Sequence, residues 1–172
     1  MDDLENREPK SINKDSVPDD TDYMAMLTQE EADEMIRLRK VFTDKRPLIV
    51  NRPYNEKREL KSERQPQETF YLHITQTAID FGNYSTVVRN FQIPLVRACI
   101  DPDKKHPNPD GTLIEGVHLH VYREGYLDRY AIPLPRSQFP DISIAHFIRD
   151  FLIYCNIEDV KINDQGSLVG MV

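Results

Sequence analysis

Cysteine, glycine and tryptophan are scarce in this chain of 172 residues. It contains two cysteines, six glycines and no tryptophan. Two cysteines exclude a disulfide framework and a zinc site built from four thiolates. Six glycines argue against a phosphate-cradling loop, and the sequence contains neither a P-loop nor a dinucleotide-binding motif. It also shows no Ser/His/Asp arrangement of the kind used in nucleophilic catalysis.

Long apolar runs are missing as well. No run approaches the roughly 18 residues that a membrane-spanning helix requires. Residues 1–10 are acidic and lack the apolar segment of a secretory signal. The sequence therefore predicts a soluble, cytoplasmic protein that does not associate with a membrane.

Negative charge is concentrated near the start of the chain. The formal net charge is −7, from 29 acidic and 22 basic residues. Residues 1–22 hold eight acids and three bases but few large apolar side chains, which predicts a disordered acidic tail. Residues 23–172 then form a single domain of nearly balanced charge. Because most of the acidity lies in the tail, nucleic-acid binding by the domain is disfavoured but not excluded.

Helical patterns near both ends enclose a region of strand patterns. Thr28 and Glu31 have the spacing of a capping box, which predicts a helix over residues 28–40. Between residues 48 and 134, short apolar or alternating runs are separated by turn residues, as in strands. Apolar side chains at helical spacing predict a second helix over residues 141–155. This order predicts an α+β fold: an antiparallel meander sheet of about five to seven strands, with the N-terminal and C-terminal helices packed on one face.

Three local predictions concern the strand region. Residues 87–100 form one long strand that is broken or bulged at Pro94, because a central strand does not tolerate proline. Residues 101–112, with three prolines and an Asp-Gly pair, form a plain loop in which Asp110 is a turn residue. Residues 58–63 form a charged edge strand. Its two faces are Arg58, Leu60 and Ser62 on one side and Glu59, Lys61 and Glu63 on the other.

The most distinctive pattern is GVHLHVYREG, at residues 116–125. Side chains two positions apart on a strand share a face, so His118, His120 and Tyr122 project together while Leu119 faces the core. The other side of this hairpin lies within residues 127–134, and Asp128 and Arg129 are expected to form ion pairs with Glu124 or Arg123 across it. The pattern predicts two imidazoles and a phenol on a solvated face of the sheet.

Three interpretations of this face stay open. The imidazoles bind a divalent metal if a carboxylate joins them, they act as the acid and base of a metal-independent ribonuclease, or they are ordinary polar residues. The preceding loop, which also carries His106, can fold back over the face and supply the carboxylate. We assign no metal and no cofactor from the sequence. The candidate catalytic residues are His118, His120, Tyr122, Arg123, Glu124 and His106.

A basic segment precedes the strongest strand pattern. Residues 45–65 contain seven bases and three acids, with aromatic residues nearby. Basic and aromatic residues together suit single-stranded nucleic acid, whereas charges on an edge strand also prevent sheets from pairing edge to edge. The second interpretation is favoured. The candidate binding residues are Arg46, Arg52, Lys57, Arg58, Lys61 and Arg64.

Six motifs follow one another along the chain. They are LTQEEA, ETFYLHI, IPLVR, HPNPDG, GVHLHVYREGYLD and FLIYCN, at residues 27–32, 68–74, 93–97, 106–111, 116–128 and 151–156. In this order they resemble a family of small uncharacterised bacterial proteins that are often found in prophages and mobile elements. Tyr130 departs from the tryptophan usual at that position of the family, which implies a change of packing.

The resemblance implies a genomic setting but no mechanism. That setting favours a protein that acts by protein–protein interaction, for example by inhibiting a host defence complex. The nearly neutral domain lacks the positive field with which a ribonuclease holds its substrate. The alternative is a toxin-like, metal-independent ribonuclease that uses the face of His118 and His120. The expected partner is therefore a protein or, in the alternative, RNA, and an uncovered sheet edge permits a homodimer.

Overall fold

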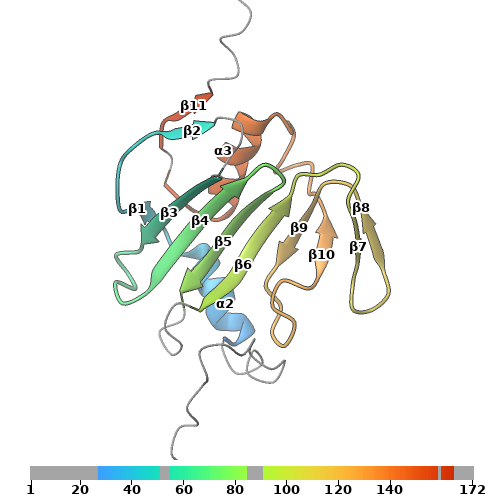
Figure 1. The fold of residues 1–172 in the computed structure, drawn as a ribbon. Coiled ribbons are helices and arrows are strands. Elements are labelled where there is room, and N and C mark those ends of the chain that lie inside the picture. The colour runs from blue at the N-terminus through green and yellow to red at the C-terminus, as the bar shows by residue number, and fades with distance from the viewer. Residues whose placement is uncertain (1–26, 51–54, 85–90, 159, 165–172) are drawn as a thin grey trace, which may run out of the picture.

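The computed structural model describes residues 27–50, 55–84, 91–158 and 160–164. These residues form an α+β fold in which one large antiparallel sheet is flanked by two helices (Figure 1). The predicted fold class is confirmed. The elements are α2 (Gln29–Arg37), β1 (Val41–Phe42), β2 (Leu48–Val50), β3 (Asn55–Lys61), β4 (Thr69–Thr75), β5 (Ala78–Tyr84), β6 (Gln92–Cys99), β7 (Lys105–Pro107), β8 (Leu113–Glu115), β9 (His118–Val121), β10 (Ala131–Pro133), α3 (Ile144–Tyr154) and β11 (Ile162–Asp164).

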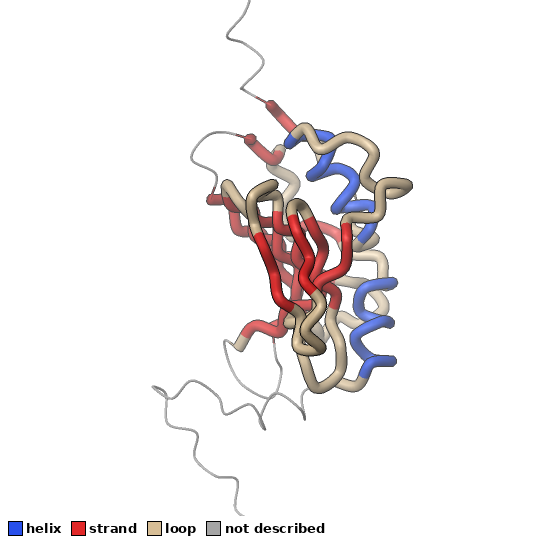
Figure 2. The backbone as a smooth tube through the Cα atoms, turned by 90° about the vertical axis from the view of Figure 1, so that its right-hand side faces the viewer, coloured by secondary structure: helices blue, strands red, loops and turns tan. Residues whose placement is uncertain are grey.

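The main sheet has seven strands in the order β1-β3-β4-β5-β6-β9-β10. From β3 to β6, each strand pairs antiparallel with the next one in the chain, which is a meander. Both helices lie on the same side of this sheet (Figure 2). Neither described helix is long and apolar enough to cross a membrane.

The core lies between the sheet and the helices. Alternate residues of the central strands, such as Phe70 and Leu72 on β4 and Phe81 on β5, are fully buried there. Helix α3 adds Phe147 and Phe151, which follow the predicted helical spacing. The two periodicities in the sequence therefore do identify the faces that meet in the core.

Helix α2 begins as predicted and ends earlier. Thr28 caps the helix, and its side chain and that of Glu31 form the reciprocal bonds of a capping box. The helix stops at Arg37, not at Lys40, and Leu38 is its C-cap. The Lys40 side chain turns back and donates hydrogen bonds to three carbonyls at the end of the helix. A lysine that caps a helix from outside is hard to distinguish in sequence from a last-turn lysine.

Proline in β6 is accommodated by an irregularity and not by a break. The pairing of β5 with β6 shifts between Phe81 and Gly82, so that Pro94 lies opposite Gly82. A side chain at position 82 would collide with the carbonyl of Ile93 and the ring of Tyr71. Glycine is therefore required where the two backbones approach closely. The strand begins at Gln92, and residues 87–90 of the predicted longer strand lie outside the described residues.

Two other local predictions are wrong. Residues 101–112 are not a plain loop, because Lys105–Pro107 pairs with Leu113–Glu115 as the β7–β8 hairpin. Strand β3 is not the edge of the sheet, because β1 pairs with its end at Val41 and Phe42. Both errors arise from short strands of two or three residues, which carry too little alternation to be recognised in sequence.

Candidate functional site

The two histidines of β9 are buried, contrary to the prediction of a solvated face. His118 is 1% exposed and His120 is 2% exposed. Their face of the sheet is covered by the β7–β8 hairpin, which brings His106 against both rings, with ring centroids 5.8 Å and 4.6 Å apart. The alternation of His118, Leu119 and His120 correctly predicted two different faces, but a second layer covers the polar one.

The hairpin is held in place by two residues of its HPNPDG motif. The Asn108 side chain accepts a bond from the backbone nitrogen of Ala131 and donates one to its carbonyl oxygen, at 2.8 and 3.0 Å. The amide thus takes the place of a neighbouring strand beside β10. His106 Nε2 lies 2.7 Å from the carbonyl oxygen of Arg129. Both contacts connect the hairpin to the segment that follows β9.

The tip of the hairpin is a turn, as predicted for Asp110. Its carboxylate accepts a bond from the backbone nitrogen of Thr112 at 2.9 Å. Gly111 has φ = +87°, which is strained for any residue with a side chain. Asp110 is therefore a turn residue and not a member of the histidine cluster.

Each of the three imidazoles has one nitrogen bound to a backbone carbonyl. His118 Nδ1 lies 2.6 Å from the oxygen of Gly116, and His120 Nδ1 lies 2.7 Å from the oxygen of Asp128. His106 contacts the carbonyl of Arg129 through Nε2. A carbonyl oxygen only accepts hydrogen bonds, so each of these nitrogens must carry a proton. In the neutral rings, the lone pairs then lie on His106 Nδ1, His118 Nε2 and His120 Nε2.

These lone pairs converge. His118 Nε2 and His120 Nε2 are 3.0 Å apart, and one ligating nitrogen from each of the three rings lies within 4.8 Å of the others. Burial lowers the pKa of His118, and burial together with the Arg97 guanidinium lowers the pKa of His120 to about 3. Two neutral rings would direct two acceptors at each other without a hydrogen to share. A cation between the nitrogens would satisfy both acceptors.

The cluster opens into a pocket of about 360 Å³. Besides the histidines, the pocket is lined by Arg97, Cys99, Asp101 and Lys104. Arg97 reaches toward both the cluster and its surroundings: one Nη atom lies 3.0 Å from the carboxylate of Asp128 and the other lies 3.4 Å from His120 Nε2. The pocket thus places two cationic side chains and one carboxylate beside the three imidazoles.

The remaining candidate catalytic residues lie elsewhere. The ring of Tyr122 belongs to the hydrophobic core, and its hydroxyl donates to the carbonyl of Leu27 at 2.7 Å. The carboxylate of Glu124 accepts a bond from the first residue of α2. The guanidinium of Arg123 lies 4.0 Å from the centre of the Tyr130 ring. The predicted ion pair of Asp128 with Arg123 across the hairpin is wrong, because Asp128 pairs with Arg97.

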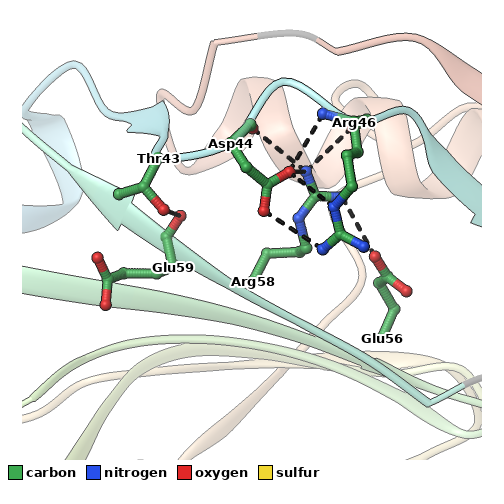
Figure 3. A network of polar contacts seen from close by, with 6 residues as sticks. All are labelled: Thr43, Asp44, Arg46, Glu56, Arg58 and Glu59. Carbon is green, nitrogen blue, oxygen red and sulfur yellow. Dashed lines mark hydrogen bonds and ion pairs between the residues drawn. The ribbon is translucent and has the colours of Figure 1, made fainter.

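The basic segment does not form a continuous binding surface. Arg58 is buried, and its guanidinium contacts the carboxylates of Asp44 and Glu56 and the carbonyl of Arg46 (Figure 3). Arg46 also pairs with Asp44, and this hydrogen bond lowers the pKa of the carboxyl group. Arg58 cannot bind a partner in this conformation, and the network joins the turn before β2 to β3.

The other predicted binding residues are dispersed. Lys57 lies over the rings of Tyr71 and Tyr84, and Lys61 donates to Thr69. Arg52 lies outside the described residues. Lys61 and Arg64 line a groove of about 500 Å³, larger than the histidine pocket, together with Arg37, Arg39 and the acidic residues Glu34 and Glu63, among others. This groove has mixed charge and no convergent ligating atoms, so the smaller pocket is the stronger candidate site.

Sequence reasoning found the histidines but not their partners. Arg97, Lys104, Asp101 and Cys99 carry no motif, and only pairing of β6 with β9 brings Cys99 opposite His118 and Arg97 opposite His120. One signal was available: His106 and Asn108 precede the HLH strand in a loop that was expected to fold back over it. The loop supplies an imidazole and not the expected carboxylate.

Comparison with known proteins gives a family without an activity. Residues 27–157 match a family of unknown function, DUF6978. No curated protein matches the chain, and no solved structure does. The matched residues include both helices, the whole main sheet and the three histidines of the cluster.

Proposed function

The chain belongs to the DUF6978 family, and we propose that it binds a divalent transition-metal ion in the histidine pocket. The ligands are His106 Nδ1, His118 Nε2 and His120 Nε2. Imidazole nitrogen suits zinc, copper, nickel and iron, and zinc is the metal most often held by three histidines. Zinc is therefore the first metal to test.

The observation that carries this proposal is the pairing of every non-ligating nitrogen with a carbonyl oxygen. Histidines that bind metals almost always donate their second N–H to a carbonyl or a carboxylate, which fixes the ring and the tautomer. Here the carbonyls of Gly116, Asp128 and Arg129 perform this role at 2.6 to 2.7 Å. The rings are therefore held with their lone pairs directed toward one region.

The distances require only a small adjustment. Zinc–nitrogen bonds of about 2.0 to 2.1 Å place tetrahedral ligands about 3.3 Å from one another. The Nε2 atoms of His118 and His120 are already 3.0 Å apart, and one ring nitrogen of His106 lies within 4.8 Å of a ring nitrogen of each. A shift of about 1 to 2 Å by the β7–β8 hairpin would complete the geometry. Arg97, which is partly exposed, stays bound to Asp128 as its other end leaves His120.

Three protein ligands leave one position for water or substrate. Structural zinc sites are closed by four protein ligands, whereas catalytic sites keep one position open. The pocket lining also holds the thiol of Cys99 and the carboxylate of Asp101, and sulfur is the ligand that zinc binds most often in structural sites. Whether the fourth position holds this thiol or water separates a structural from a reactive centre, and a cobalt(II) spectrum reports the difference through a sulfur-to-metal band.

The geometry argues against one of the two functions predicted from sequence and leaves the other open. A metal-independent ribonuclease needs a histidine that is protonated near neutral pH to act as the acid. The lowered pKa values of His118 and His120 do not favour that role. Interaction with a host protein, in a phage or mobile-element setting, stays a prediction, and a bound metal is compatible with it.

Calorimetric titration of the tag-free protein with zinc tests the proposal. We expect one ion per chain, and His106→Ala should lower the affinity by at least about 100-fold, because even outer-shell changes cost 10- to 100-fold. His146→Ala is the matched control, since His146 contacts only Asp141 and Ser143 near the start of α3. Unchanged affinity in His106→Ala, or equal loss in His146→Ala, would contradict the proposal.

A further inference from the structure

The wall of the pocket beside the histidines carries positive charge. Arg97 and Lys104 line it, with Asp101 as the one acidic residue among the lining residues that the structure describes. We propose that this pocket is a hydrolytic site for phosphate esters, with water bound at the open position of the metal. The inference rests on the metal centre proposed above and names the substrate class and reaction of the same site.

Arg97 is positioned to hold a phosphate next to the metal. Its guanidinium is oriented by the carboxylate of Asp128 at 3.0 Å, while the other Nη atom lies 3.4 Å from His120 Nε2. A phosphate oxygen that accepts a bond from this second Nη would therefore lie beside the position between the imidazoles. The planar fork of arginine suits phosphate oxygens better than a single point charge does.

Lys104 gives the pocket a second cationic side chain. It precedes β7, and its carbonyl accepts a bond from the backbone nitrogen of Gly116 at 2.8 Å, just before β9. The base of the hairpin is thus fixed, and the lysine lines the pocket together with Arg97. Because Asp101 and Asp128 offset the charges of Lys104 and Arg97, the divalent metal would give the site the net positive charge that favours an anionic substrate.

The size of the pocket is compatible with a small ester. Its volume of about 360 Å³ lies within the range of about 300 to 1,000 Å³ that small-molecule sites occupy. A mononucleotide or a comparable phosphate ester fits this volume, whereas a folded macromolecule would present only one group to it.

The reaction needs water as its only co-reactant. With a metal bound, water at the open position would lose a proton to solvent, because a divalent metal lowers the pKa of its bound water to near 7. The hydroxide would attack phosphorus, and a new P–O bond would form as the bond to the leaving alkoxide oxygen breaks. The leaving oxygen takes a proton from solvent, so that proton and charge balance. Arg97 and Lys104 stabilise the negative charge on the non-bridging oxygens.

Two model esters and a neutral one test the inference on the zinc-loaded protein. The substrates are bis(4-nitrophenyl) phosphate, 4-nitrophenyl phosphate and 4-nitrophenyl acetate. Arg97→Gln should lower kcat/KM for the preferred phosphate ester by about 10- to 100-fold, the worth of a charged hydrogen bond, and change the acetate reaction little. Lys104→Gln should act in the same direction more weakly. Lys105→Gln is the matched control, because the side chain of Lys105 pairs with Glu115 outside the pocket lining.

Zinc affinity is measured in parallel for each variant. Normal zinc binding with no hydrolysis of either phosphate ester would overturn the inference and leave the metal centre intact. A wild-type protein that does not bind zinc would instead refute the proposed function. Equal activity in His106→Ala would show that free zinc performs the reaction. Equal effects of Lys104→Gln and Lys105→Gln would show that the pocket wall does not recognise the phosphate. Preference for the diester or the monoester identifies which ester the site takes.

Discussion

Two buried polar centres of this protein differ in how completely their hydrogen-bonding groups are satisfied. Lys40 is fully buried behind α2, and its ammonium donates to the carbonyls of Met35, Ile36 and Leu38 at 2.6 to 2.9 Å. A lysine ammonium has three hydrogens, so every donor is used. In the histidine cluster, by contrast, only one nitrogen of each ring is paired with a carbonyl.

The difference separates a structural group from a reactive one. Lys40 satisfies the carbonyls that α2 leaves at its C-terminal end, and its ammonium lies 4.7 Å from the centre of the Phe81 ring. Nothing in that arrangement remains to bind a ligand. The histidines leave three lone pairs directed at one region beside a pocket. Ring nitrogens that lie close together beside a pocket and have no carbonyl partner are where ligand binding is expected.

The largest effect is expected when the three hydrogen bonds of the Lys40 ammonium are removed. Lys40→Met keeps much of the volume but leaves three carbonyls without their donor. We expect the free energy of unfolding to fall by about 3 kcal/mol, at roughly 1 kcal/mol for each lost bond. Urea denaturation measures this loss. Arg39→Met is the control, since Arg39 forms an exposed ion pair with Glu158, and a similar loss there would contradict the structural role of Lys40.

A smaller effect is expected when zinc binds in the histidine pocket. Zinc at 100 times its dissociation constant should stabilise the wild-type protein by about 2.7 kcal/mol. The gain should be absent in His106→Ala and retained in Lys40→Met, because the two centres lie apart. Thermal or urea unfolding with and without zinc measures it. Stabilisation of His106→Ala by the same amount would show that zinc binds elsewhere.

The link that positions the cluster can be broken separately. Asn108→Ala removes both bonds to Ala131 and should lower the free energy of unfolding by about 2 kcal/mol, because the backbone groups of a buried residue lose their partners. The zinc affinity should fall as well, since His106 lies on the same hairpin. Asp110→Ala, at the exposed tip, is the control. Normal zinc affinity in Asn108→Ala would show that the hairpin needs no such anchor.

The smallest effect is expected from pH. Burial lowers the pKa of Lys40 to about 7 from an ordinary 10.5. Between these values the unfolded chain binds more protons than the folded one, so the stability rises with pH, by at most about 1.4 kcal/mol per pH unit. The difference in unfolding free energy between wild type and Lys40→Met should therefore increase by about 1 kcal/mol from pH 7 to pH 8. A constant difference would show that the three carbonyls keep Lys40 charged throughout.

Several features could be predicted from sequence because their causes are local. The capping box of Thr28 and Glu31, the apolar stripe of α3 and the alternation of β9 each depend on residues within a few positions of one another. The turn at Asp110 and Gly111 belongs to the same class. The patterns therefore predicted the α+β fold and the histidines worth examining.

Other features depend on what lies above or beside an element. Alternation showed that His118 and His120 face away from Leu119, but not that a second layer covers them. Arg58 looked like an exposed base on an edge strand, yet the turn that carries Asp44 folds over it. Neither case could be resolved without knowing which distant segment covers the residue.

The sequence by itself determined the periodicities, the caps and the turn chemistry of this protein, because those follow from bonding between near neighbours. Only the tertiary structure decided that His106 meets His118 and His120 and that Arg97 and Lys104 line the same pocket. The physical reason is the distance along the chain over which these contacts form: Asn108 and Ala131 are 23 positions apart, and their pairing places the hairpin over β9.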